Sequence, residues 1–308
     1  MDIIEQAAKR LEELRSAGIE IPAPDQKVGT DKTASPLAST PMAAVSHPAA
    51  SVSRQLDLDL SVLAAHGIVT PDRDRTQLAD ELRVLKRPLI QNASGKSAAP
   101  IKDANLIMIT SAMPGEGKTY LATNLAMSIA MELDHRVLLV DADVARPSVP
   151  KVLGFGQEKG LLDVLTDSSL DLSQVLLRTN IEKLTILPAG TQHPRATELL
   201  ASDAMNHLLA EMAQRYPDRI IIFDSPPLLV TTEARALASH MGQVVLVVKA
   251  ESTSHAEVKN AVAAIDGCPV KMVALNRVAG HLDGHGYGYG YGYGYGYGRN
   301  SVKEEGKA

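Results

Sequence analysis

The segment from Ala112 to Thr119, Ala-Met-Pro-Gly-Glu-Gly-Lys-Thr, restricts the fold more than any other part of the chain. An apolar run, Leu106–Thr110, precedes it, and a helix-like segment, Tyr120–Met131, follows it. A strand, a glycine-rich turn ending in Lys-Thr and a helix together form a P-loop, whose backbone N–H groups surround phosphates at a helix N-terminus. Ala112 stands at the consensus first glycine, but the flanking strand and helix support the assignment.

Each residue of this motif has an expected part in holding a nucleotide. The backbone amides of the turn bind phosphate, Lys118 reaches the outer phosphates, and the hydroxyl of Thr119 binds Mg²⁺. The expected cofactors are therefore ATP and Mg²⁺. The residues assigned to the nucleotide site are Pro114, Gly115, Glu116, Gly117, Lys118, Thr119 and Tyr120.

Composition limits the class of protein. With 308 residues, 45% apolar content and a net charge of −5, the chain has room for one sizeable core with appendages. No apolar run approaches the ~20 residues of a membrane span and no signal sequence is recognisable, so we expect a cytoplasmic protein that reaches a membrane through a partner. The single cysteine, Cys268, fits a reducing compartment. The mild acidity gives no support for nucleic acid as a partner.

The pattern along the chain predicts five regions. An amphipathic helix, Asp2–Gly18, is followed by a linker rich in Pro, Ala, Ser and Thr, and helical periodicity returns at Leu56–Ala65 and Thr76–Leu89. The predicted boundaries are an N-terminal helix at 1–21, a flexible linker at 22–55, a helical extension at 56–100, a P-loop domain at 101–280 and a tyrosine- and glycine-rich tail at 281–308.

Within the P-loop domain, short apolar runs alternate with helical segments. Runs rich in Val, Ile and Leu are typical of parallel strands buried on both faces, so we predict an α/β P-loop NTPase fold, with a mainly parallel sheet flanked by helices. The predicted strands are Leu106–Thr110, Val137–Asp141, Leu184–Leu187, Ile220–Asp224, Val244–Lys249 and Met272–Asn276. The predicted helices are Tyr120–Met131, Ala196–Arg215, Glu233–Ala238 and Ser254–Ala264.

Two of these strands end in carboxylates. The first is followed by Asp141 and Asp143, and the second ends at Asp224 before a proline pair. Ligands of such sheets bind beyond the carboxyl ends of the strands, where Lys118 is also expected. We therefore predict a catalytic group of Lys118, Asp141, Asp143 and Asp224. Mg²⁺ takes oxygen ligands and retains water, so Thr119 with Asp143 and Asp224 is the predicted metal site.

The tail supplies an acceptor for phosphoryl transfer. Six tyrosines alternate strictly with glycine, a composition that predicts a disordered segment with exposed hydroxyl groups. The last predicted strand ends near Asn276 at the edge of the sheet that carries the P-loop, so the tail can reach its own site or a neighbour's. The predicted phosphoacceptors are Tyr287, Tyr289, Tyr291, Tyr293, Tyr295 and Tyr297.

These motifs together resemble the bacterial tyrosine kinases, the P-loop autokinases of capsule and exopolysaccharide systems. The likeness extends over Leu56–Tyr297 and is closest to the kinases associated with exosortase-linked loci. In that family the P-loop holds ATP, aspartates of the second motif assist metal binding and activate the tyrosine hydroxyl, and the Walker B aspartate supports Mg²⁺. The resemblance implies those roles for Lys118 and Thr119, for Asp141 and Asp143, and for Asp224.

The resemblance also implies partners. These are a transmembrane chain-length determinant (polysaccharide co-polymerase) that activates the kinase, a cognate protein-tyrosine phosphatase, and further copies of the chain in a homo-oligomer.

Two positions depart from the family pattern. Ala145 occupies the position of an arginine and is followed by Arg146. The helical Glu-x-x-Arg-x-x-Arg motif that contacts a neighbouring subunit is present only as Asp80, Arg83 and Lys86, for which a solvated helix surface is the alternative.

Two other functions share the P-loop. A positioning ATPase has the same fold and motifs, but it typically carries a lysine five positions before the P-loop lysine, where this chain has Met113. A catalytically silent nucleotide-binding scaffold is the second alternative, and Ala145 motivates it. We predict an autokinase because a positioning ATPase leaves the tyrosine tail unexplained. A phosphotyrosine blot separates the scaffold from the kinase, since a scaffold would stay unlabelled.

Overall fold

The computed structural model describes residues 54–73, 76–215 and 218–278. The predicted N-terminal helix, nearly all of the predicted linker and the six tail tyrosines lie outside these residues. The described elements are β1 (Gln55–Leu56), α2 (Leu60–Ala65), α3 (Gln77–Ala93), β2 (Leu106–Ser111), α4 (Lys118–Ala130), β3 (Arg136–Asp141), α5 (Val149–Leu153), α6 (Leu161–Thr166), α7 (Leu172–Val175), β4 (Leu177–Thr179), β5 (Leu184–Leu187), α8 (Ala196–Leu200), α9 (Asp203–Arg215), β6 (Arg219–Asp224), α10 (Thr232–Ala238), β7 (Gln243–Lys249), α11 (His255–Ala264) and β8 (Val270–Asn276).

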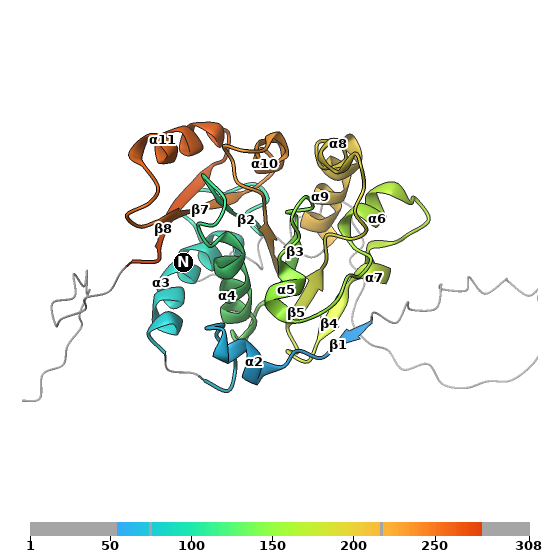
Figure 1. Ribbon diagram of the computed structural model, residues 1–308, viewed down its shortest axis with the longest axis horizontal. Coiled ribbons are helices and arrows are strands. Elements are labelled where there is room, and N and C mark those ends of the chain that lie inside the picture. Colours follow the sequence, from blue (N-terminus) through green and yellow to red (C-terminus); the bar gives the residue numbers. More distant parts are fainter. Residues whose placement is uncertain (1–53, 74–75, 216–217, 279–308) are drawn as a thin grey trace, which may run out of the picture. The chain divides into compact units, whose positions relative to one another are not determined.

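One sheet organises the described chain, with the strand order β1-β4-β5-β3-β6-β2-β7-β8 (Figure 1). The strand that leads into the P-loop, β2, lies between β6 and β7, and β3 lies on the other side of β6; these strands are parallel. The register places Asp141 opposite Asp224. The topology therefore brings the P-loop and the carboxylates of two other strands to one edge of the sheet, as predicted.

Helices cover both faces of the sheet. Successive side chains of each strand point to opposite faces and pack into two separate hydrophobic clusters. On one face, Ile107 and Ile109 of β2 pack in a cluster with α2, α3, α4 and α5. On the other, Leu106 and Met108 belong to a cluster that includes α6 to α11. Strands buried on both faces are almost continuously apolar, which explains why the sequence located them correctly. The α/β prediction is confirmed.

The N-terminal extension shares the core of the P-loop domain. The fully buried Gln243 of β7 donates from Nε2 to the carbonyl of Leu89 at 3.0 Å and to that of Ala104 at 2.7 Å, and it accepts from Asn92 Nδ2 at 2.8 Å. The Val69 N–H donates to Asn124 Oδ1 of α4 at 2.8 Å. Because buried polar groups are costly unless they are bonded, these contacts fix the extension against the sheet.

The structure corrects the interpretation of Lys86 as part of a solvated or subunit-facing charged surface. Its side chain is buried, and Nζ lies 2.6 Å from Glu132 Oε1 and donates to the carbonyl of Ser128 at 2.8 Å. Arg83 and Asp80 form an ion pair on the exposed part of α3. Lys86 therefore joins α3 to α4 within the chain, and only the other two charges are accessible.

Two element boundaries also differ from those predicted. The segment predicted as one helix from Leu56 begins with strand β1, and α2 starts only after Asp59, whose Oδ1 accepts the N–H groups of Ser61 and Val62. The predicted helix Ala196–Arg215 is interrupted at Ser202, whose Oγ accepts the Met205 N–H and begins α9. In both places a side chain that accepts backbone N–H groups fixes the start of a helix, although the apolar periodicity extends further back in the sequence.

Strand β4 and the short helices α5, α6 and α7 were not predicted. β4 pairs antiparallel with β5, so the sheet is mainly rather than wholly parallel. Helices of four to six residues carry too little periodicity to be recognised, and β4, with three residues, is too short for a clear apolar run. None of the described helices combines the length and the apolar character that crossing a membrane requires.

Candidate functional site

The P-loop occupies the turn between β2 and α4. Gly117 adopts φ +100° and precedes the first residue of the helix, Lys118. Gly115 also has a positive φ, +81°, a conformation that other residues seldom adopt. The two glycines allow the turn to present its backbone N–H groups at the N-terminus of α4, which is the arrangement that binds phosphate.

Distant residues hold this turn in place. The buried Glu116 accepts the Met113 N–H through Oε2 at 2.9 Å, and its other oxygen accepts the hydroxyl of Thr253. Asn276, at the end of β8, donates from Nδ2 to the Glu116 carbonyl at 2.9 Å. The acidic residue of the turn is therefore a structural brace, and its side-chain oxygens are committed to the protein rather than to phosphate.

Replacing Gly117 by Ala is expected to damage the site more than replacing Gly115. A Cβ on Gly117 would lie 2.0 Å from Asn276 Nδ2, whereas a Cβ on Gly115 has nothing within 4 Å. Both substitutions carry a backbone penalty of about 1 kcal/mol, so the steric conflict separates them. We expect Gly117→Ala to weaken nucleotide binding at least about tenfold more than Gly115→Ala, measured with a fluorescent ADP analogue. Equal losses would contradict the role of Asn276 as a brace.

The predicted catalytic side chains meet beneath the turn. Lys118 Nζ lies 2.8 Å from Asp143 Oδ2. Asp141 Oδ2 accepts the N–H groups of Ser148 and Val149, each at 3.1 Å, and so fixes the start of α5. The four predicted groups, Lys118, Asp141, Asp143 and Asp224, are thus assembled as expected, but one oxygen of Asp141 has a structural partner that the sequence did not indicate.

Burial governs the electrostatics of these carboxylates. It raises the pKa of Asp141 to about 8, and the neighbouring charge of Asp224 adds to the effect. Burial also raises the pKa of Asp224, to about 7, although the Lys118 ammonium opposes that shift. Two neighbouring acids that resist ionisation indicate a site with a deficit of positive charge.

The unpartnered oxygens fit a bound divalent cation. Asp141 Oδ1 and both carboxylate oxygens of Asp224 are buried and have no hydrogen-bond partner among the described residues. Mg²⁺ accepts oxygen ligands and would neutralise these charges. Within residues 54–73, 76–215 and 218–278 no group of three His, Cys, Asp or Glu side chains is arranged to hold a metal, so other ligands must be added. The Thr119 hydroxyl, phosphate oxygens and water are suitable.

The raised pKa of Asp224 predicts a pH-dependent stability. Its pKa is about 7 in the folded protein and near 3.8 in the unfolded chain, so the folded state binds more protons between these values. The free energy of unfolding should therefore fall as pH rises from about 4 to about 7. Without nucleotide or metal, we expect Asp224→Asn to flatten this slope and to be at least about 1 kcal/mol more stable than wild type at pH 8.

Urea denaturation at several pH values measures this difference. The matched control is Asp266→Asn, because Asp266 has an exposed side chain outside the site. A slope that is the same in Asp224→Asn and wild type would show that the Asp224 carboxyl is not held in the environment described here.

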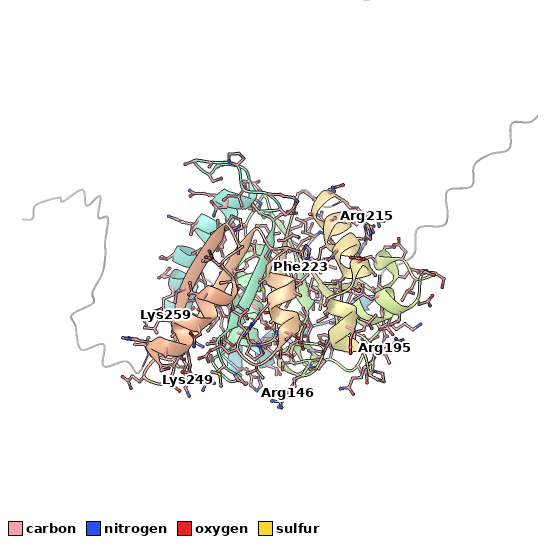
Figure 2. All side chains as sticks on the ribbon, turned by 90° about the horizontal axis from the view of Figure 1, so that it is seen from above. Arg146, Arg195, Arg215, Phe223, Lys249 and Lys259 are labelled. Carbon is pink, nitrogen blue, oxygen red and sulfur yellow. The ribbon has the colours of Figure 1, made fainter. Side chains whose placement is uncertain are left out.

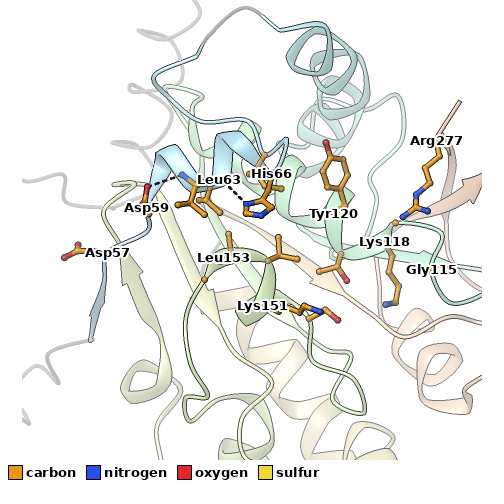
Figure 3. Close-up of a pocket in the computed structure, with 17 residues that line it drawn as sticks. Asp57, Asp59, Leu63, His66, Gly115, Lys118, Tyr120, Lys151, Leu153 and Arg277 are labelled. Atoms are coloured by element: carbon orange, nitrogen blue, oxygen red, sulfur yellow. Dashed lines mark hydrogen bonds between the residues drawn. The ribbon is translucent and has the colours of Figure 1, made fainter. Parts of the chain in front are cut away.

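A cavity of about 740 Å³ adjoins the P-loop. Figure 3 shows Leu63 of α2, His66 just after the end of α2, Leu153 and Lys151 of α5, and Lys118 around it. Its further lining residues include Gly115, Gly117, Thr119, Tyr120, Ser148 and Arg277. The volume lies in the range of small-molecule sites, and the cavity includes the turn expected to hold phosphate.

Tyr120 contributes differently from the other P-loop residues. Its hydroxyl donates to the Gly67 carbonyl at 2.7 Å, and burial raises its pKa. The side chain thereby joins α4 to the turn after α2 and forms part of the cavity wall. Tyr120 was assigned to the nucleotide site, and the structure places it beside that site, with its hydroxyl committed to the protein.

Comparisons with known proteins agree with this architecture. The protein-family model described as an AAA domain matches residues 104–271. Over 167 residues the chain is 35% identical to the tyrosine-protein kinase YwqD of Bacillus subtilis (strain 168), an alignment that covers 54% of this chain and 69% of YwqD. The chain belongs to the bacterial tyrosine-protein kinase family.

Two further members have the same relationship to the chain. It is 31% identical over 183 residues to the tyrosine-protein kinase wzc of Salmonella typhimurium (strain LT2), covering 59% of this chain but only 25% of wzc. The solved kinase domain of VpsO superposes with a TM-score of 0.52 at 29% identity, over 66% of this chain and all of that domain. The alignments thus cover about a quarter of the length of wzc and about two thirds of that of YwqD.

One departure from the family pattern can be located in the structure. Ala145 and Arg146 are both exposed, and Figure 2 shows Arg146 at the periphery of the molecule. Its backbone N–H, rather than its guanidinium, donates to Asp143 Oδ1 at 3.2 Å. In this bacterial tyrosine kinase chain, Arg146 therefore supports Asp143 through its backbone.

Sequence reasoning missed four residues at this site. Thr253 and Asn276 brace the P-loop from 137 and 160 positions away, a separation that no local pattern reveals. Lys151 and Arg277 line the cavity beside the P-loop. Lys151 follows the second aspartate motif by only a few residues, and this proximity was the one signal available. The pattern gave no corresponding signal for the other three.

Proposed function

We propose that this chain is an ATP-dependent protein-tyrosine autokinase that phosphorylates Tyr287, Tyr289, Tyr291, Tyr293, Tyr295 and Tyr297. The observation that carries the proposal is the assembly of Lys118 and three aspartates beside a P-loop cavity, in a chain that ends in a tyrosine cluster. Its membership of the bacterial tyrosine-protein kinase family supports the same reaction.

The residues divide into binding and reacting groups. The backbone of Pro114–Gly117 and the side chain of Lys118 bind the phosphates of ATP. Thr119, Asp143 and Asp224 hold Mg²⁺, which, when bound, neutralises charge on the transferring phosphoryl group. Lys118 is ready for this role because its ammonium already lies in a buried, acidic site.

The transfer itself requires little covalent chemistry from the protein. A tyrosine hydroxyl attacks the γ-phosphorus, a new oxygen–phosphorus bond forms, and the bond to the β-phosphate oxygen breaks to release ADP. The proton of the hydroxyl passes to a carboxylate of Asp141 or Asp143. Among the described residues, Asp141 Oδ1 has no hydrogen-bond partner, and a bound cation would favour the ionised carboxylate that its raised pKa otherwise disfavours.

The proposed biological setting is capsule or exopolysaccharide production. Phosphorylation of all six tyrosines would add about 9 to 12 negative charges to a short segment, a change able to alter an oligomer. We propose that the kinase is cytoplasmic and peripheral to the inner membrane. Its partners there are a transmembrane chain-length determinant that activates it, a tyrosine phosphatase that resets it, and further copies of the chain. An exosortase-linked locus is the proposed genetic context.

Intact-mass spectrometry tests the activity. After incubation with Mg²⁺ and ATP, we expect a series of added phosphates that peptide mapping confines to Tyr287–Tyr297. ATP hydrolysis without added phosphate, even with the cytoplasmic segment of a membrane activator present, would favour a positioning ATPase. Nucleotide binding without either reaction would favour a scaffold.

A further inference from the structure

One wall of the cavity is not explained by nucleotide phosphates. The cavity is lined there by Val62 and Leu63 of α2 and by Lys151, Val152 and Leu153 of α5. Figure 3 labels Leu63, Leu153 and Lys151. We call these five residues the α2–α5 wall. Val62 is 47% exposed although it is apolar, and it faces a cavity that also contains the P-loop. Leu63 and Leu153 are only 2% and 3% exposed, so Val62 and the half-buried Val152 supply the accessible apolar surface of this wall. Together with the Lys151 cation, this surface suits an aromatic ring that carries, or receives, negative charge.

The α2–α5 wall lies on the side of the P-loop from which an acceptor must approach. In a P-loop, the lysine marks the β- and γ-phosphates. Lys118 is paired with Asp143, and the chain continues from Asp143 through the cavity-lining Ser148 into α5. Because the attacking oxygen must lie beyond the γ-phosphate and opposite the leaving group, the α5 side is the acceptor side.

Lys151 is held in place to interact with that acceptor. Asp141 accepts the N–H groups of Ser148 and Val149, so the buried carboxylate of the second motif anchors the helix that carries Lys151. In the part of the chain that the structure describes, no carboxylate forms an ion pair with Lys151. Its charge therefore remains available to a phosphate or to a developing phenolate.

The described chain ends beside the same cavity. Arg277 lines the cavity, and the described chain ends at the next residue, Val278. Tyr287 follows nine positions later in the sequence, which is a reach of up to about 30 Å for an extended chain. A tyrosine of residues 287–297, from the same or a second copy, is therefore within range of the wall.

We propose that the α2–α5 wall is the acceptor subsite, where a tail tyrosine packs its ring on the apolar side chains with its hydroxyl toward Lys151. The proposal rests on the kinase function proposed above. Lys151 acts as a positioning residue that attracts the charge on the tyrosine oxygen and on the phosphate after transfer.

Peptide binding tests the subsite without requiring turnover. The reference protein is the full chain with its six tail tyrosines replaced by Ser, loaded with MgADP, and the probe is a fluorescein-labelled (Gly-Tyr)₃ peptide followed by anisotropy. We expect Val62→Asp to weaken peptide binding at least about fivefold, because it places a carboxylate against the ring. Binding of a fluorescent ADP analogue should change less than about twofold. Val84→Asp is the matched control, since Val84 is 76% exposed on α3 and does not line the cavity.

A second variant isolates the charge. Lys151→Ala should weaken binding of the tyrosine-phosphorylated peptide more than binding of the unmodified peptide. Lys259 is an exposed lysine of α11, and Lys259→Ala should change the binding of neither peptide. Failure of the reference protein to bind peptide, or equal effects of Val62→Asp and Val84→Asp, would overturn the subsite. If Val62→Asp weakened nucleotide binding as much as peptide binding, the subsite would also be overturned, because the wall would then contact the nucleoside. Intact, variant-sensitive peptide binding without phosphate transfer would support the subsite and contradict only the kinase proposal.

Discussion

Replacing Lys118 by Met is expected to reduce autophosphorylation at least about 100-fold. Lys118 Nζ lies 2.8 Å from Asp143, and its positive charge also acts on the buried Asp224. Without it, the phosphates of ATP would meet a site dominated by negative charge. Incorporation of labelled phosphate from ATP, measured at saturating nucleotide, gives the effect directly.

The fold should survive this substitution, which makes the result interpretable. Removing one partner of a buried ion pair is costly, but the carboxyl groups beside it can remain protonated, as the raised pKa values of Asp141 and Asp224 show. Circular dichroism should therefore match that of wild type. Lys259→Met is the control, because Lys259 is exposed on α11 (Figure 2). If Lys118→Met were labelled as strongly as this control, Lys118 would not be required for phosphate transfer.

Replacing all six tail tyrosines by Phe is expected to remove most of the labelling and to leave nucleotide binding unchanged. Phe keeps the aromatic ring but lacks the hydroxyl that attacks the γ-phosphorus. The cavity and the P-loop brace are formed by residues up to 277, so their contacts do not require the tail hydroxyls. Phosphopeptide mapping and titration with a fluorescent ADP analogue measure the two properties separately.

Undiminished labelling would point to a different acceptor. Tyr120 is poorly placed for that role, because its hydroxyl donates to the Gly67 carbonyl and lies against the turn after α2. Tyr120→Phe in the six-fold variant therefore serves as the control, and we expect it to lower thermal stability slightly without a further change in labelling. Labelling that disappears only with Tyr120 would contradict the assignment of the tail.

The sequence predicted the central strands well because burial on both faces leaves a strong apolar signal. It also predicted that Lys118, Asp143 and Asp224 would meet, since parallel strands end at a common edge. It did not predict the strand order that sets Asp141 opposite Asp224, because pairing partners are distant in sequence. Nor did it predict the short helix α5, and with it the role of Lys151 remained hidden.

Charge spacing on α3 was the least reliable signal. Three charges at regular intervals suggested one exposed face, yet the structure buries Lys86 against α4. A long side chain can turn inward when a carboxylate and a carbonyl are available to receive it, and both come from residues more than 40 positions away. A subunit contact through this helix must therefore depend on Asp80 and Arg83.

The brace on the P-loop also determines when the nucleotide site can form during synthesis. Glu116 belongs to the first third of the P-loop domain, whereas Thr253 lies between β7 and α11 and Asn276 ends β8. A nascent chain that has only its glycine-rich turn lacks the contacts that shape it. ATP therefore cannot bind in its final geometry until the C-terminal edge of the sheet has emerged and paired. Nucleotide capture would then mark a late stage in the folding of this domain.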